Sequence, residues 1–371
     1  MIMDVIQRNF FRLLRSGTFG DNEAIEPMSA SKWNRLYNIS LMHGVAALVY
    51  DGIVNRKNDF FLQIPPQQTA KWNKTVEDIE QSNRLINTHI SELFYILNKE
   101  QLRPILLKGQ SFASLYDNGL HRTSGDVDIY FPYSPQAKKA DLWAKEQGSD
   151  IDGSEKYILK YNWQNVQVEH HRYVQRLTNK LLNRKMQGII DSEIRCCDSV
   201  YVIINGTKIE VIPPTLNLLL IIVRIARYIL SEGISLKQII DLGTFLRKEG
   251  DKVDFVKLQK WIDQLRLQHM AQLEGSLLVH LFRFSEDEIP FMSSTMNEDI
   301  SKIMDEIFLL SANHSEDWYF TQGRNIFVRT SNSSAMMWHL RHSAKFFRYY
   351  PSEIVTNFFA SFAHSLSHIE E

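Results

Sequence analysis

Two aspartates, Asp126 and Asp128, stand two residues apart among apolar residues in the segment GDVDIYF. Successive side chains of a β-strand point to opposite faces, so this spacing predicts both carboxylates on one face and Val127 and Ile129 on the other. Neighbouring carboxylates repel each other, and a shared divalent cation is the usual remedy. The pair therefore predicts a metal site, against the alternative of a solvated polar face on an edge strand.

A glycine turn precedes the acidic pair. The apolar run Leu102–Leu107 predicts a buried strand, and the residues from Lys108 to Ser111 predict a turn around Gly109 into a short helix. Free backbone N–H groups and the helix dipole suit a phosphate at such a turn, although glycine often only closes a strand-helix connection. Arg122 has the bidentate geometry that favours phosphate oxygens. A phosphate cradle beside a metal pair indicates phosphoryl or nucleotidyl transfer.

Two strand-like runs follow, Lys156–Tyr161 and Asn165–His171. In the second run, Glu169 and His171 share a face, and Val166 and Val168 lie on the opposite one. The pair of adjacent histidines at the end of this run has no second pair nearby at zinc-ligand spacing, and the adjacent cysteines Cys196 and Cys197 form no Cys-x-x-Cys pattern. The sequence therefore does not predict a zinc site.

The order of strand, LKG turn, helix, arginine and Asp-x-Asp resembles the DNA polymerase β-like nucleotidyltransferase superfamily. The form LLKG…Arg-x-x-x-Asp-x-Asp is similar to an uncharacterised bacterial nucleotidyltransferase family within it, over roughly residues 85–245. The resemblance implies an α+β fold, with a mixed β-sheet core, helices packed on it, and flanking helical regions. It also implies an enzyme that uses two Mg²⁺ ions, with Mn²⁺ as an alternative, and an NTP as co-substrate.

The resemblance also assigns roles to residues. Asp126 and Asp128 would hold both ions, and Glu169 is the best candidate for the third metal carboxylate, which the superfamily carries on a neighbouring strand. The fallback third ligands are Asp152, Glu155 and Glu210. The nucleotide-binding residues expected are Lys108, Gly109, Ser111 and Arg122. One ion would lower the pKa of the acceptor hydroxyl and the other would neutralise the leaving pyrophosphate, with Glu169 or a water taking the proton.

The implied function is transfer of a nucleoside monophosphate from an NTP to a hydroxyl acceptor, most simply on a small molecule. One alternative is a non-catalytic binding or regulatory protein of the same fold, and another is a toxin-type or RNA-modifying nucleotidyltransferase. Nucleic acid could contact a basic stripe on a helix expected over Gln175–Gln187. That stripe consists of Arg172, Arg176, Lys180 and Arg184. Such a stripe is more often a solvated helix face.

The composition is that of an ordinary globular protein, with 371 residues, 44% of them hydrophobic, and a net charge of −1. This charge gives no general attraction to long nucleic acids or acidic membranes. The two adjacent cysteines are poorly placed to bridge each other and indicate a reducing compartment. Neither a signal peptide nor an apolar run long enough to span a bilayer is recognised, so we expect a cytoplasmic protein.

Periodicity predicts three regions: a helical region over 1–100, the α/β core over 101–214 and a helical domain over 215–371. In the first region, helices are expected over Trp33–Val49 and over about Thr69–Lys99. Asn205-Gly206 predicts a type I′ hairpin within Tyr201–Ile212. The tail holds an aromatic and basic run, Trp338–Tyr350, and a last helix is expected over Ser352–His368. Asp241 has no polar partner that the sequence identifies.

Overall fold

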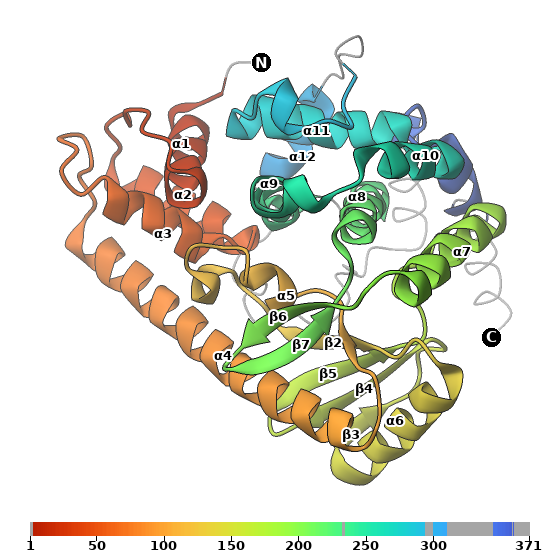
Figure 1. Cartoon of the computed structure of the whole chain (residues 1–371). Helices are drawn as coiled ribbons and strands as arrows, with labels where there is room; N and C mark the ends of the chain where they lie inside the picture. The colour runs from red at the N-terminus through yellow and green to blue at the C-terminus, as the bar shows by residue number, and fades with distance from the viewer. Residues whose placement is uncertain (1–2, 232–233, 294–299, 310–343, 358, 360–371) are drawn as a thin grey trace, which may run out of the picture.

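The fold is that of a computed structural model, which describes residues 3–231, 234–293, 300–309, 344–357 and 359. A mixed seven-stranded sheet lies at its centre, with helices on both sides (Figure 1). The strand order is β3-β4-β5-β2-β1-β7-β6. The expected α+β class with a mixed sheet is confirmed.

The strands are short and come from the middle of the chain. Their bounds are β1 Ile105–Leu106, β2 Asp126–Tyr130, β3 Ser149–Asp152, β4 Ile158–Trp163, β5 Val166–His171, β6 Val200–Ile204 and β7 Thr207–Val211. β2 runs parallel to β5 and antiparallel to β1, while β1 runs parallel to β7. The β6–β7 hairpin turns at Asn205 and Gly206, both at positive φ (45° and 79°), as a type I′ turn requires.

The helices before and within the sheet region include one very long helix. Their bounds are α1 Val5–Phe19, α2 Ala30–Met42, α3 Ala46–Asn55, α4 Pro66–Lys99, α5 Gln110–Ala113, the 3₁₀ turn η1 Gly119–His121, α6 Ser134–Gln147 and α7 Lys180–Cys196. Pro66 suits the first turn of α4, because proline has no N–H group to leave unpaired there. In Figure 1 this helix runs from α3 past the β6–β7 hairpin, with which it is in contact, toward β3.

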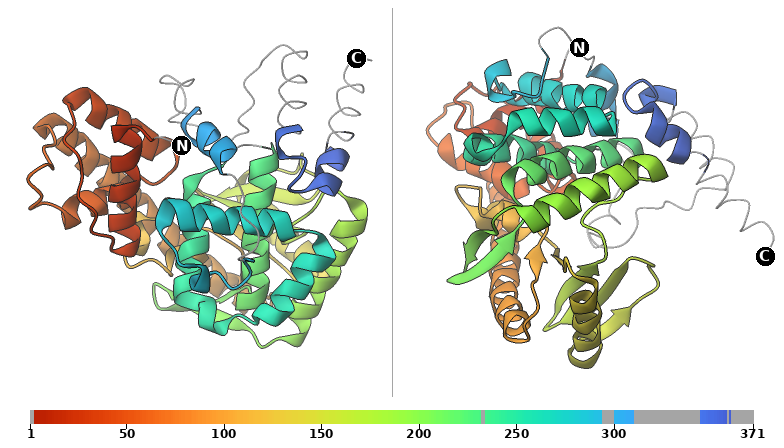
Figure 2. Two further views of the ribbon diagram at one scale, coloured as in Figure 1. Left: turned by 90° about the horizontal axis from the view of Figure 1, so that it is seen from above. Right: turned by 45° about the vertical axis from the view of Figure 1, so that its right-hand side comes forward.

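The helices after the sheet pack together on its other side. Their bounds are α8 Pro214–Ser231, α9 Leu236–Glu249, η2 Gly250–Lys252, α10 Phe255–Leu265, α11 Gln268–Phe282, η3 Glu286–Glu288 and α12 Ser301–Leu309. α8 is buried on most of its circumference, and it contacts α9, α10 and α11. Figure 2 shows this layer stacked above the sheet.

The two faces of the sheet belong to two different cores. Val127, Ile129 and Val168 pack toward α4 and α6 in the smaller core. Ile105 and Tyr130 face the opposite way, into the large core built with α7 and α8. Because side chains alternate along β2, Asp126 and Asp128 share the face of Tyr130. The acidic pair therefore points toward the helical layer that follows the sheet.

The first helix packs against a helix from far along the chain. Arg15 donates a hydrogen bond to the carbonyl of Leu281 at the end of α11 (3.0 Å). The rings of Phe11 and Phe282 meet edge to face, with centroids 6.1 Å apart. The large core thus joins α1 to the helices that follow the sheet.

Two expected helices differ from the structure. The helix expected over Trp33–Val49 is two helices, α2 and α3. The chain leaves helical geometry between them at Gly44, whose φ is +65°. The helix expected from Gln175 begins at Lys180 instead: Asn179 caps it by accepting from the N–H groups of the first turn. Residues 338–343 of the run Trp338–Tyr350, and most of Ser352–His368, lie outside the described residues.

Candidate active site

The acidic residues converge across two parallel strands. Asp128 on β2 lies directly opposite Glu169 on β5, and Asp126 lies opposite Gln167. One ligand atom each from Asp128, Glu169 and His171 lie within 4.8 Å of one another. The β-sheet register thus brings the predicted third carboxylate beside the predicted pair, and it adds a histidine two residues further along the same face of β5.

Three cations balance these carboxylates. Lys108 Nζ lies 3.1 Å from Asp128 Oδ1 and 3.5 Å from Asp126 Oδ2. His171 Nε2 lies 2.7 Å from Asp128 Oδ1 and 3.3 Å from Glu169 Oε2. Lys160 on β4 lies 3.3 Å from Glu169. The cluster is therefore close to neutral in total.

The two aspartates differ in their electrostatics. Burial alone would raise the pKa of Asp128, but the charges of Lys108 and His171 hold that pKa well below its usual range. The Asp128 charge, and then burial, raise the pKa of Asp126. Burial would lower the pKa of His171, but its hydrogen bonds to Asp128 and Glu169 raise it to about 9. Asp128 is therefore the carboxylate of the cluster that stays ionised most readily on acidification.

One oxygen of Asp128 has no partner. The side chain is 0% exposed, and Oδ2 accepts no hydrogen bond from the residues that the structure describes. A buried oxygen of an ionised carboxylate without a partner costs free energy. An oxygen-rich cluster with such an orphaned anionic atom fits a divalent cation, and Asp126, Asp128 and Glu169 are the residues that would hold it.

The glycine turn closes tightly on the acidic strand. Gly109 has φ +67° and ψ −111°, a conformation that residues with a side chain rarely adopt. A Cβ there would lie 3.4 Å from the carbonyl oxygen of Asp126. Ser111 is buried, and its Oγ has no hydrogen-bond partner in the described part of the chain. The turn therefore places Lys108 within ion-pair distance of both aspartates of β2.

Arg122 has protein partners that were not predicted. Its Nε and Nη2 donate to the two carboxylate oxygens of Asp241 on α9, each at 2.7 Å. Its Nη1 donates to the carbonyl of Gly109 and to Ser124 Oγ, both at 3.0 Å. The guanidinium is thus engaged by protein acceptors on both sides, and it braces the glycine turn. The phosphate role of Arg122 stays a prediction, while these contacts show that Arg122 also positions the glycine turn. Asp241 has in Arg122 the partner that the sequence did not identify.

The loop just before Arg122 is held by the N-terminal helices. His121 Nδ1 lies 2.8 Å from Asp51 on α3, and its Nε2 lies 2.9 Å from Glu80 on α4. Asn83 on α4 donates to the carbonyls of Leu120 and Arg122. Helices α3 and α4 therefore hold the segment Leu120–Arg122, which leads into β2, in place.

Two cations of the helical layer face the site and were not predicted. Arg224 on α8 packs over the ring of Phe112, and Asp241 and Asp128 both act on its charge. It makes no ion pair with any residue that the structure describes, and burial lowers its pKa. Lys237 on α9 donates to the carbonyl of Thr123, and burial lowers its pKa to about 8. Arg224 could have been recognised in the sequence, because it is a single arginine directly after the apolar run Leu218–Val223.

The basic stripe is not a helix face. Arg172 and Arg176 precede α7: Arg172 pairs with Asp141, and Arg176 lies over the ring of Tyr157, 3.9 Å from its centroid. Lys180 and Arg184 are exposed on α7. The prediction that these four residues share one helix face is wrong, because α7 begins only at Lys180. Contact with nucleic acid through them stays a prediction.

The fallback third ligands have other partners. Glu210 on β7 accepts from Arg103 (2.6 Å), away from β2 and β5 in the strand order. Glu155 lies 2.7 Å from Lys160, which also reaches Glu169. Asp152 belongs to the edge strand β3 and is exposed. The strand register favours Glu169 over all three.

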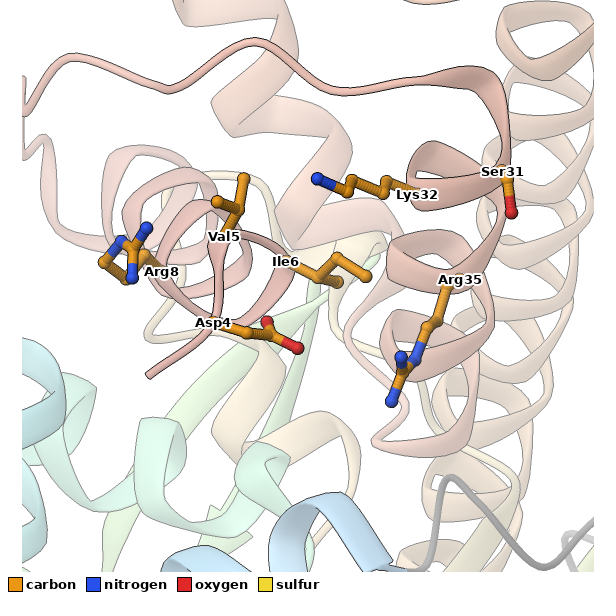
Figure 3. A pocket seen from close by; sticks show the side chains of 7 residues that line it. All are labelled: Asp4, Val5, Ile6, Arg8, Ser31, Lys32 and Arg35. Atoms are coloured by element: carbon orange, nitrogen blue, oxygen red, sulfur yellow. The ribbon is translucent and has the colours of Figure 1, made fainter. Parts of the chain in front are cut away.

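A separate pocket of about 470 Å³ lies between α1 and α2 (Figure 3). It is lined by Asp4, Val5, Ile6, Arg8, Ser31, Lys32 and Arg35. None of the residues predicted from the sequence lines it, so it plays no part in the candidate site.

Among the helices that the structure describes, none combines the length and the apolar character that crossing a membrane requires.

A mixed sheet with an Asp-x-Asp strand, a glycine turn beside it and a carboxylate on the adjacent strand defines a nucleotidyltransferase fold. An uncharacterised nucleotidyltransferase family matches residues 29–283, and the chain belongs to this family. No curated protein matches the chain. The chain is similar to a solved structure of an antigenic nucleotidyltransferase-like protein from Paracoccidioides brasiliensis. That similarity has 17% identity and a TM-score of 0.36, and it covers 53% of this chain and 91% of the other.

Proposed function

We propose that the protein is a metal-dependent enzyme that transfers a nucleoside monophosphate from an NTP to a hydroxyl acceptor. The observation that carries this proposal is the strand register, which puts Asp128 of β2 directly opposite Glu169 of β5, with Asp126 two residues before Asp128. The buried Asp128 Oδ2 has no hydrogen-bond partner among the residues that the structure describes. Family membership supports the same class of reaction. The carboxylates would hold the ions, and the glycine turn would hold the terminal phosphates.

Divalent ions bound there would supply electrostatic stabilisation of the phosphate charge and acidify the acceptor hydroxyl. The protein's own contribution is positioning. Lys108 already neutralises Asp126 and Asp128, and its ammonium would turn to the phosphates when ions take over that role. Ser111 offers a buried hydroxyl and Arg224 a guanidinium to the same phosphates, and neither group has a hydrogen-bond or ion-pair partner in the described part of the chain. Arg122 keeps the turn in place through Gly109.

Glu169 is the proposed proton acceptor. Burial would raise its pKa, but the hydrogen bond from His171 lowers it, so the carboxylate is ionised at neutral pH. Its place directly opposite Asp128 puts the ionised oxygens next to the metal ligands. A weak base next to the ions suffices, because the ions lower the pKa of the hydroxyl that it must deprotonate.

The acceptor is proposed to be a small molecule. The near-neutral net charge gives no general attraction to nucleic acid. The four basic residues that favoured an RNA-modifying enzyme do not share a helix face. A non-catalytic binding protein of the same fold is the alternative that the test must separate.

The test begins with thermal unfolding in the presence of each NTP with Mg²⁺, Mn²⁺ or EDTA. An NTP at about 100 times its dissociation constant adds about 2.7 kcal/mol and raises the midpoint by several degrees. The NTP that binds is then used, labelled at the α-phosphate, with pools of small alcohols, sugars and RNA. Metal-dependent label transfer that is lost in Asp128→Asn and kept in Asp150→Asn supports the proposal. Binding without transfer to any pool favours the non-catalytic alternative, and no binding of any NTP overturns both.

A further inference from the structure

We propose that His171 is itself a metal ligand, so that the site takes a first-row transition-metal dication through one imidazole and two carboxylates. The inference adds a nitrogen ligand to the carboxylates discussed above, and it rests on the proposed function only for what the ion does in the reaction. It changes the expected ion, because Mg²⁺ is served by oxygen ligands whereas imidazole favours transition metals.

The first support is geometric. Glu169 and His171 stand two residues apart on β5, so both side chains project from the same face toward β2. His171 Nε2 lies 2.7 Å from Asp128 Oδ1 and 3.3 Å from Glu169 Oε2. The imidazole nitrogen therefore lies beside both carboxylates, at the separation that the ligand atoms of one shared ion have from each other.

The second support is independent of the histidine. Asp128 Oδ2 is a buried carboxylate oxygen that finds no hydrogen-bond donor among the residues described, although Oδ1 of the same group has both Lys108 and His171. An unpartnered anionic oxygen in a fully buried side chain indicates a missing cationic partner. The ligand set for that partner would be Asp128, Glu169 and His171, the three residues whose ligand atoms lie within 4.8 Å.

The neighbouring histidine provides the contrast. His170 points to the opposite face of β5, where its ring nitrogens lie 3.1 Å from Tyr161 Oη and 3.2 Å from Asp141 Oδ1. That histidine is engaged by fixed partners in the smaller core and has no access to the carboxylates. Strand alternation alone thus separates a structural histidine from the one that we assign to the metal.

A competing account gives His171 a purely structural role, in which its ring only orients Asp128. Mn²⁺ distinguishes the two, because it is paramagnetic and a directly bound nitrogen modulates its electron spin echo. The experiment adds Mn²⁺ alone to the full-length protein and to protein labelled with ¹⁵N-histidine. It then compares His171→Gln with His280→Gln, in which an exposed histidine of α11 is replaced.

The expected result is a ¹⁴N modulation that changes to the ¹⁵N frequency in the labelled protein, disappears in His171→Gln and remains in His280→Gln. The labelled wild type needs no substitution, so the nitrogen can be detected even if His171→Gln does not fold. Calorimetry should show that His171→Gln binds Mn²⁺ about 10-fold or more weakly, with a smaller loss for Mg²⁺.

The failures of this inference and of the proposed function are distinct. Bound Mn²⁺ without nitrogen modulation overturns the histidine ligand and leaves nucleotidyl transfer through carboxylates intact. Nitrogen modulation that no NTP alters supports the histidine ligand and counts against the proposed function. Wild-type protein that binds no Mn²⁺ overturns the inference outright.

Discussion

Arg122 and Asp241 form a buried ion pair with two hydrogen bonds of 2.7 Å, which joins the loop before β2 to helix α9. Removing one partner leaves the other charge buried and unpaired, so Asp241→Asn should lower the free energy of unfolding by about 3–5 kcal/mol. Chemical denaturation measures this loss. The double variant Arg122→Met/Asp241→Leu should recover most of it, because neither charge of the pair remains buried. Equal losses in the single and double variants would contradict this account.

The two aspartates of β2 should respond to the same substitution in opposite ways. Lys108 and His171 stabilise ionised Asp128. In EDTA, Asp128→Asn should therefore lower the free energy of unfolding by about 3 kcal/mol, and the melting temperature should fall with it. Ionised Asp126 is destabilised by the Asp128 charge and by burial, so Asp126→Asn should raise the melting temperature. Calorimetric melting at neutral pH tests this, with the exposed Asp150→Asn as the matched control. Shifts of the same sign in both variants would show that the charges are not balanced as described.

Arg224 should act on nucleotide binding and not on folding. A charge-assisted hydrogen bond is worth about 1.5–3 kcal/mol, so Arg224→Ala should weaken NTP binding by roughly 10- to 100-fold. The free energy of unfolding of the Arg224→Ala variant should be unchanged or higher, because the substitution removes a half-buried cation that has no ion pair among the described residues. Titration calorimetry measures the affinity, and Arg184→Ala on the exposed face of α7 serves as control. Unchanged NTP affinity in Arg224→Ala would remove this residue from the phosphate site.

The His121 contact should make stability depend on pH. Burial alone would lower the pKa of His121, but Asp51 and Glu80 raise it, so its contribution is complete below about pH 6.5 and is lost as the pH rises through the raised value. The hydrogen bond from His121 lowers the pKa of Glu80, whose contribution is present above about pH 4.5 and lost on acidification. The contact should therefore be strongest between these values.

Urea denaturation of wild type and His121→Gln at pH 6 and pH 9 tests this. The difference in unfolding free energy between the two proteins should be larger at pH 6. His171, whose pKa is also raised, titrates in both proteins and cancels in the comparison. A difference that is equal at both pH values would mean that His121 is neutral in the fold.

The sequence predicted the fold through its resemblance to a known superfamily, and it predicted the strand faces of the acidic residues through local periodicity. Alternation along β2 and β5 assigned Asp126, Asp128 and Glu169 to their faces without knowledge of the tertiary structure. The residues from Lys108 to Ser111 were placed by the same local reasoning, since a glycine at the end of a strand has few conformational roles. The metal-binding and nucleotide-binding roles of these residues remain predictions.

The remaining features depend on contacts between distant parts of the chain. Arg122 was assigned to phosphate because its partner Asp241 lies 119 residues away. α7 begins late because Glu353 accepts hydrogen bonds from the N–H groups of Thr178 and Asn179, a contact that no local pattern contains. His171 was considered only as half of a zinc pair with His170, although strand alternation sends the two rings to opposite faces.

The contact between Arg15 and Leu281 spans 266 residues. A ribosome that adds about 5–20 residues per second therefore completes α1 roughly 13–53 s before α11 follows. During that interval the side of α1 that carries Phe11 has no covering helix, so it is a segment at risk of aggregation during synthesis. Nascent chains that stop before α11 should accordingly depend on chaperones, even when α1, α2, α3 and every strand have already been made.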